Sequence, residues 1–101
     1  MNVQQALDLV YARLLGEHSL PVKIRTRQPL CKQEVEALFL AIDFLTAHYK
    51  DHELIPKTLA SAFVDIYGSF SVSDEVVGEV EARWYEAIGI ALQDKVYTLL
   101  E

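Results

Sequence analysis

One long apolar stretch, from Lys32 to Lys50, most constrains how this chain can fold. Apolar residues recur in it at intervals of three and four, which is the spacing of one face of an α-helix. That face consists of Val35, Leu38, Phe39, Ile42, Leu45 and Tyr49. Further apolar residues flank this face and leave only a narrow polar strip. A helix of this kind is usually covered on several sides by other helices, so we expect it to be the central one.

The stretch is one of four that have helical patterns, over residues 2–15, 32–50, 56–67 and 74–100. Asn2 is a suitable N-cap for the first helix, and Pro56 suits the first turn of the third. Ser73 is a suitable N-cap for the last helix, which would be about 40 Å long at 1.5 Å per residue. A chain of 101 residues fits one domain. The sequence therefore predicts an all-α, four-helix bundle-like single domain with a long C-terminal helix.

Residues 17–31 do not fit this helical pattern. Two prolines bracket a run, Val22–Arg27, in which apolar and basic residues alternate. Alternation with a period of two indicates an extended segment, here with Val22 and Ile24 turned inward. A lone strand has no partner in a helical protein, so we expect an irregular basic loop that lies across the helices.

Charge is distributed unevenly along the chain, whose net charge is −6. Residues 1–50 contain five acidic and six basic residues, whereas residues 51–101 contain ten acidic and three basic ones. An acidic second half repels nucleic acid and attracts a basic partner. In size and charge the chain resembles small immunity proteins that block basic toxins, a likeness of composition without a shared motif.

The setting that we expect is the cytoplasm. Cys31 is the single cysteine and has no partner for an intramolecular disulfide, which is typical of a reducing compartment. The N-terminus has no basic segment followed by an apolar run, the pattern of a secretion signal. No stretch reaches the roughly 18 uninterrupted apolar residues of a membrane span, so we expect no membrane association.

Two clusters suggest sites that bind ions. His48 and His52 stand one helical turn apart and could share a divalent metal, for which His18 and Asp43 are the further ligands that the sequence offers. The same histidines, near a helix C-terminus, also complement the negative end of the helix dipole without any metal.

The second cluster is basic and consists of Lys23, Arg25, Arg27 and Lys32. It could contact phosphates of a nucleic acid. However, no aromatic residues alternate with these cations to stack on bases. Pairing with the acidic last helix, within the chain or between subunits, explains the cluster equally well.

The last helix is apolar on more than one side as far as its end. Gly89 costs roughly 1 kcal/mol in a helix interior, which suggests that another backbone approaches closely there. We expect a second copy of the chain to pack on this helix through Gly89, Ile90, Val96 and Tyr97. In the competing arrangement, the helix kinks at Gly89 and folds back on its own bundle.

No motif in the sequence indicates catalysis: it contains no glycine-rich phosphate loop, nucleophile elbow or Cys-x-x-Cys pair. We therefore expect a small acidic protein–protein interaction module without enzymatic activity or cofactor. It would be an adaptor, a regulator or an immunity-like inhibitor, and a homodimer. A metal-binding protein and a small regulator of nucleic acid are the alternatives.

Overall fold

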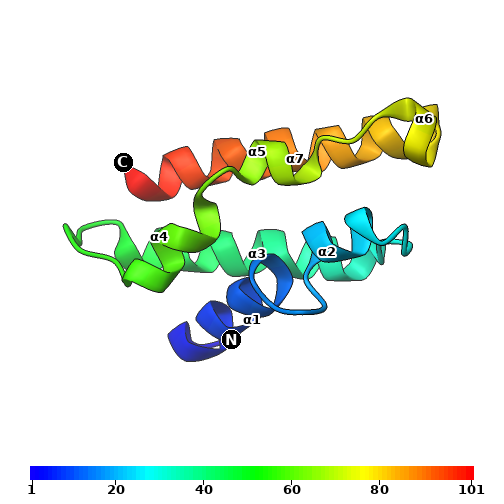
Figure 1. The fold of residues 1–101 in the computed structure, drawn as a ribbon. Coiled ribbons are helices and arrows are strands. Elements are labelled where there is room, and N and C mark those ends of the chain that lie inside the picture. Colours follow the sequence, from blue (N-terminus) through cyan, green and yellow to red (C-terminus); the bar gives the residue numbers. More distant parts are fainter.

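The computed structural model describes the backbone of residues 1–101 and every side chain except that of Asp74. Within these limits the chain is all-α, as predicted, and has no strand (Figure 1). Seven helical segments take the place of the four predicted helices. They are α1 (Val3–Leu14), α2 (Leu20–Arg25), α3 (Lys32–Tyr49), α4 (Lys57–Phe63), α5 (Ile66–Phe70), α6 (Asp74–Val77) and α7 (Glu79–Leu100).

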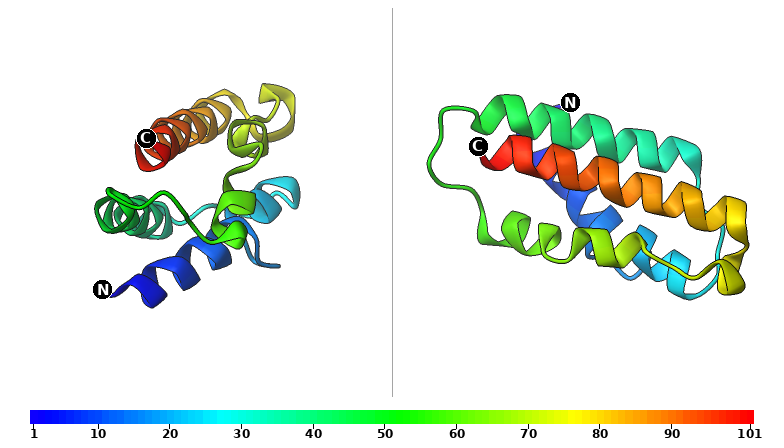
Figure 2. Two further views of the ribbon diagram at one scale, coloured as in Figure 1. Left: turned by 90° about the vertical axis from the view of Figure 1, so that its left-hand side faces the viewer. Right: turned by 90° about the horizontal axis from the view of Figure 1, so that it is seen from above.

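Helix α3 has the central position that its sequence predicts. It packs against α1 on one side and against α7 on another, while α4 and α5 complete the core. Figure 2 shows α3 and α7 side by side and running in the same direction. Of the predicted inward face, Val35, Leu38, Ile42 and Leu45 are buried and Phe39 and Tyr49 are partly buried. Leu40, by contrast, is 64% exposed, so α3 is not covered on all sides.

The apolar core is continuous and draws on every helix except α6. Its largest fully buried side chains include Phe70, Leu38, Ile42, Leu45 and Leu92. None of the described helices is both long and apolar enough to cross a membrane.

Helix α1 begins where the sequence predicts. The Asn2 side chain accepts a hydrogen bond from the Gln5 backbone N–H at 2.8 Å, and the Gln5 side chain accepts one from the Asn2 N–H at 3.0 Å. This reciprocal capping box satisfies two of the free N–H groups at the helix N-terminus.

The prediction of an extended loop between α1 and α3 is wrong, because residues 20–25 form helix α2. The Ser19 hydroxyl caps this helix by accepting a hydrogen bond from the Val22 N–H at 3.4 Å. A proline in the first turn costs no hydrogen bond. Leu20 and Ile24 stand four residues apart and are both buried, whereas Val22 is only partly buried. The helical spacing of Leu20 and Ile24 therefore prevails over the period-two pattern.

The prediction of one helix over residues 56–67 is also wrong, because this part of the chain forms two helices, α4 and α5. Pro56 is the N-cap, and α4 ends at Phe63. Val64 is extended, and Asp65 adopts a left-handed conformation at φ 55°. This corner turns Ile66 into the core and leaves Val64 74% exposed. Aspartate is among the few non-glycine residues that tolerate this conformation.

The predicted helix over residues 74–100 is interrupted at Gly78. The φ of Gly78 is +93°, a conformation that glycine adopts without the steric cost met by other residues. The short helix α6 precedes this break, and the Ser73 hydroxyl accepts a hydrogen bond from the Glu75 N–H at 3.2 Å. The last helix, α7, is consequently 22 residues long.

Candidate functional site

The parallel arrangement of α3 and α7 produces a groove between them, which we call the α3–α7 groove. Each helix lines it with side chains at intervals of three or four residues, so that each contributes one face. The residues from α3 and its C-cap are Lys32, Val35, Glu36, Phe39, Asp43, Thr46, Ala47 and Lys50. Those from α7 are Trp84, Ala87, Ile88, Ala91, Asp94, Lys95, Thr98 and Leu99.

The end of the groove near the N-termini of both helices is apolar. Phe39 and Trp84, both partly buried, form its walls, and Ala87 and Ala91 leave a hollow of about 210 Å³ between them. Larger side chains at the two alanine positions would fill this hollow. It is therefore sized for one or two apolar side chains of another molecule.

An ion pair crosses the middle of the groove. The Lys95 Nζ lies 2.7 Å from an oxygen of Asp43, and the two side chains are 28% and 55% exposed. The same Nζ lies 5.4 Å from the centroid of the Phe39 ring, within the range of a cation–π interaction. These contacts hold α7 in register with α3, although an ion pair this exposed is worth no more than about 1 kcal/mol.

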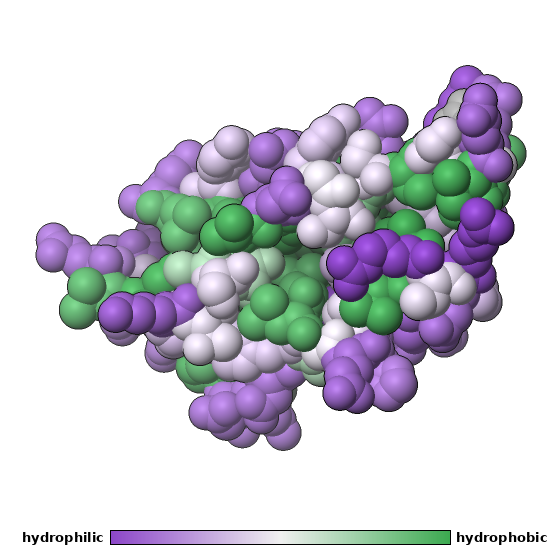
Figure 3. Space-filling view, in the orientation of Figure 1, coloured by the Kyte–Doolittle hydropathy of each residue, from purple (hydrophilic) through white to green (hydrophobic). Residues whose placement is uncertain are grey.

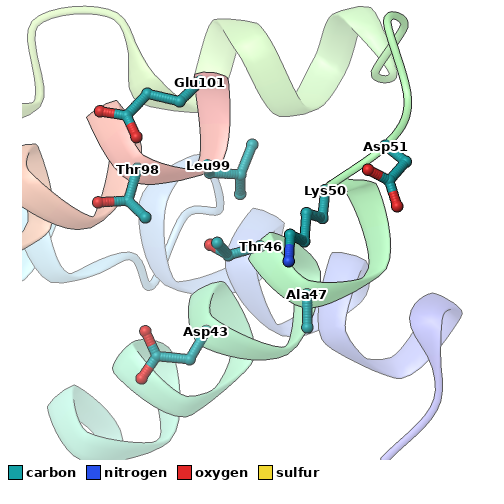
Figure 4. A pocket seen from close by; sticks show the side chains of 8 residues that line it. All are labelled: Asp43, Thr46, Ala47, Lys50, Asp51, Thr98, Leu99 and Glu101. Atoms are coloured by element: carbon teal, nitrogen blue, oxygen red, sulfur yellow. The ribbon is translucent and has the colours of Figure 1, made fainter.

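The other end of the groove is wider, with a volume of about 480 Å³, and most of the residues that line it are polar or charged. In Figure 4, Thr46 comes from α3 and Lys50 from the C-cap of α3, whereas Thr98, Leu99 and Glu101 come from the end of the chain. Asp51 lies at its edge, so carboxylates lie on both sides of the hollow. The groove therefore joins an apolar pocket to a wider one whose charged residues are mainly acidic.

The structure brings the two histidines of the predicted metal site together. The rings of His48 and His52 stack with their centroids 5.2 Å apart, and the ring of Tyr49 meets each of them edge-on. Among the described residues, however, no third cysteine, histidine, aspartate or glutamate joins them in a group that could hold a metal. His18 is not brought into such a group, and Asp43 pairs with Lys95.

The basic cluster is divided by the fold. The Lys23 Nζ lies 3.0 Å from an oxygen of Glu34, which ties α2 to α3. The partner of Lys23 is thus on the central helix and not, as the sequence suggested, on the acidic last one. Arg25, Arg27 and Lys32 are exposed. A surface that has lost one of its four charges to an ion pair is a weaker attractant for phosphates.

The residues predicted to bind a second copy separate into two groups. Gly89 and Val96 are buried within one chain. A Cβ added to Gly89 would lie 3.0 Å from the Phe70 Cβ and 3.5 Å from the Tyr67 carbonyl oxygen, so the close neighbour is α5 of the same chain. The helix that approaches Gly89 is therefore not the partner helix that we expected, and α7 is unbroken there. Ile90 and Tyr97 remain 45% and 60% exposed.

The face formed by α2, α4 and α5 offers a less continuous surface. Figure 3 shows its apolar area divided into separate patches by polar side chains. A hollow of about 250 Å³ lies there, and the hydroxyl-bearing residues Ser19, Ser61 and Ser69 contribute to its lining. Surface of this kind is ordinary for a small protein, since much of any protein surface is apolar.

Two tyrosines have raised pKa values. Burial, followed by the neighbouring Tyr49 and Asp8, raises the pKa of Tyr11. Burial, followed by the Glu81 carboxylate, raises the pKa of Tyr85. Neither tyrosine lines the α3–α7 groove. The shifts thus reflect packing of the two rings and do not identify an acid or a base at this site.

The groove was not predicted from the sequence, although most of its residues lie on predicted helices. The available signal was the spacing of Trp84, Ala87 and Ala91, in which a large side chain stands beside two small ones on one helix face. Comparison of the chain with protein-family models, with curated proteins and with solved structures finds no match.

Proposed function

We propose that this protein is a non-enzymatic protein–protein interaction module, an adaptor, regulator or inhibitor, that binds its partner in the α3–α7 groove. The observation that carries the proposal is the uncovered apolar end of the groove. Phe39 and Trp84 stand apart there, and two alanines form the space between them. Aromatic walls around a small hollow are typical of pockets that receive an anchoring side chain of another protein.

The charges around the groove indicate the chemistry of the partner. Five carboxylates line its length, on Glu36, Asp43, Asp51, Asp94 and Glu101, against three ammonium groups, on Lys32, Lys50 and Lys95. One of each is already paired, in the Lys95–Asp43 bridge. The remaining excess of negative charge favours a segment that carries an apolar anchor and basic neighbours. An amphipathic helix with lysine or arginine on its polar face has these properties.

The proposal includes a reducing, cytoplasmic setting, which suits a chain with the single cysteine Cys31. It also includes self-association through the C-terminal helix, for which the support now comes from the exposed Ile90 and Tyr97. Gly89 and Val96 no longer contribute to that argument, because both are buried within one chain.

Trp84 is the single tryptophan, so its fluorescence reports on the groove directly. The probe is a synthetic amphipathic helical peptide of leucine and lysine without tryptophan. We expect it to bind with a micromolar Kd and to shift the Trp84 emission to shorter wavelength as the ring loses water. A peptide with the same leucines and with glutamate in place of lysine should not bind.

A variant that fills the hollow separates groove binding from general attraction to an acidic protein. Ala91→Lys should weaken binding of the lysine peptide at least tenfold. Ala12→Lys introduces the same charge at an exposed position of α1 and should leave the Kd unchanged. Equal affinities of the two variants would refute the groove as the binding site.

A further inference from the structure

The outward side of α7 carries a second surface, which adjoins the groove and shares Ala87, Asp94 and Glu101 with it. No other helix covers this side, as the view of Figure 2 from above shows. We call its residues the outer stripe. They stand three or four apart and are Val80, Arg83, Ala87, Ile90, Asp94, Tyr97 and Glu101. All are exposed, with Val80 at 79% and Tyr97 at 60%.

Intervals that alternate between three and four residues make the outer stripe a coiled-coil seam in geometry. The order of its apolar and charged residues matches the same stripe running in the opposite direction. When the stripe is read from both ends toward a centre between Ile88 and Gly89, the residues that meet are Val80 with Tyr97, Arg83 with Asp94, and Ala87 with Ile90.

We propose that two copies of the protein pair through the outer stripe with their α7 helices antiparallel. In this register, Arg83 of one copy faces the partner's Asp94, and the second copy repeats the same ion pair by symmetry. Two equivalent ion pairs then flank a central apolar layer, in which Ala87 and Ile90 of each copy meet the partner's Ile90 and Ala87. A symmetric interface of this type uses one surface patch twice and is closed by two copies.

The charges exclude the parallel alternative. Parallel helices in register would place Arg83 against the partner's Arg83, and Asp94 against the partner's Asp94. Like charges that face one another across an interface are unfavourable, whereas the antiparallel register replaces both contacts with attractive ones.

The residues beside the stripe agree with the antiparallel register. Trp84 would lie beside the partner's Ala91, so a large side chain meets a small one. Glu86 would lie beside the partner's Gln93, so no carboxylate faces another at this position. The contact is only one helix wide, and interfaces of small area are weak. We therefore expect a Kd of about 10–100 µM.

The pairing rests on the self-association included in the proposed function and specifies its register, and it uses a face of α7 that borders the groove along Ala87 and Asp94. In the free chain Arg83 pairs with Glu79, one turn away on the same helix. This pair is largely exposed and contributes little to stability, so Arg83 is available to the partner's Asp94 at small cost.

Charge reversal tests the register by analytical ultracentrifugation. Arg83→Asp should be monomeric at concentrations at which the wild type dimerises, because two carboxylates would then face each other. Asp94→Arg should be monomeric as well, because two guanidinium groups would do so. An equimolar mixture of the two variants should dimerise, since each opposed pair in the heterodimer again joins a carboxylate to a guanidinium group.

The mixture cannot dimerise through general attraction. The wild-type charge is −6 and each substitution changes it by two, so both variants remain acidic. Lys57→Asp makes a reversal of the same size at an exposed position of α4, and it should dimerise like the wild type. Circular dichroism should show that all the variants keep the helix content of the wild type.

Two results would overturn the antiparallel pairing: a wild type that stays monomeric at 200 µM, taken as about twice the upper Kd, or a mixture that stays monomeric. Neither result affects the groove, because peptide binding is measured at low micromolar concentration, where the protein is monomeric in either case. Conversely, failure of the peptide to bind would leave the outer stripe untouched. Peptide binding in the groove and antiparallel pairing can therefore fail separately, whereas a monomeric wild type would also refute the self-association.

Discussion

Replacing Gly89 by alanine tests whether α5 packs on α7 as the structure shows. In an open helix position this change stabilises a protein by about 1 kcal/mol, because alanine has the higher helix propensity. At Gly89 the new Cβ would lie 3.0 Å from the Phe70 Cβ. A Cβ atom cannot rotate away from a contact as the end of a side chain can, so the α5 backbone itself has to shift. Crowding of this kind costs about 1–3 kcal/mol.

The crowding cost exceeds the gain in propensity, so Gly89→Ala should lower the free energy of unfolding by about 1 kcal/mol. Urea denaturation followed by circular dichroism at low micromolar concentration measures this change. The midpoint temperature should fall by about 4–8 °C in a protein of this size. Ala87→Gly is the matched control: it lies two residues away on the exposed side of α7 and should cost about 1 kcal/mol from propensity alone.

The result that would refute this reasoning is a gain of about 1 kcal/mol in Gly89→Ala. It would mean that the space beside Gly89 is open and that α5 does not contact α7 there. A change that depends on protein concentration would instead indicate that a second copy approaches the glycine, as the sequence suggested.

Three further predictions concern the core, a strained backbone position and alkaline pH. Leu38→Ala should cost about 2–5 kcal/mol in urea denaturation, because Leu38 is fully buried; a loss below 1 kcal/mol would contradict its place in the core. Arg27→Gly should stabilise the fold by about 0.5–1 kcal/mol, since Arg27 has φ 60° after the end of α2; a loss of stability would show that its side chain contributes more than the strain. The raised pKa of Tyr85 means that the unfolded chain releases the phenol proton first, so stability is intact below pH about 10 and falls as the pH rises further. Tyr85→Phe should show a smaller fall between pH 10 and 11 in urea midpoints, and an equal fall would refute this assignment.

The parts of the fold that the sequence predicts well are those in which a long helical pattern agrees with local capping. Helix α1 has a capping box at Asn2, and its apolar residues Leu7, Val10 and Leu14 are buried at helical spacing. Helix α3 begins at the expected residue, because its periodic apolar face continues unbroken from Val35 to Tyr49. In both helices the local preference for helix agrees with the burial of the apolar face, so few other conformations compete with the observed one.

The errors fall where one residue decides the path of the backbone. Nothing in the spacing of Leu59, Phe63 and Ile66 shows that Asp65 adopts a left-handed conformation between them, since the same residues also fit one continuous helix face. From the sequence, Gly78 could equally lie inside a continuous helix or interrupt it. Its positive φ in the structure shows that it interrupts the helix. The backbone conformation at such positions depends on where the neighbouring helices lie. The periodicity of the sequence does not contain this information.

The α3–α7 groove could not be derived from the sequence for a related reason. Its walls come from helices that are distant in the chain, and their contact depends on whether the two run parallel or antiparallel. The Lys95–Asp43 pair records the parallel alignment, because each residue lies in the C-terminal half of its own helix. From the sequence alone, each of these residues has several other partners of opposite charge.

The position of α3 between α1 and α7 has a consequence for the order in which the helices fold and unfold. Residues 50–78 have to return along the length of α3 before α7 can lie beside it, so the α3–α7 contact closes a longer loop than the α1–α3 contact does. Closing a longer loop costs more chain entropy. We therefore expect α1 and α3 to form the earlier contact in folding and α7 to dock on them afterwards. In native-state hydrogen exchange the amides at the middle of α3 should be the last to exchange, because they open only when the partners on both sides have left.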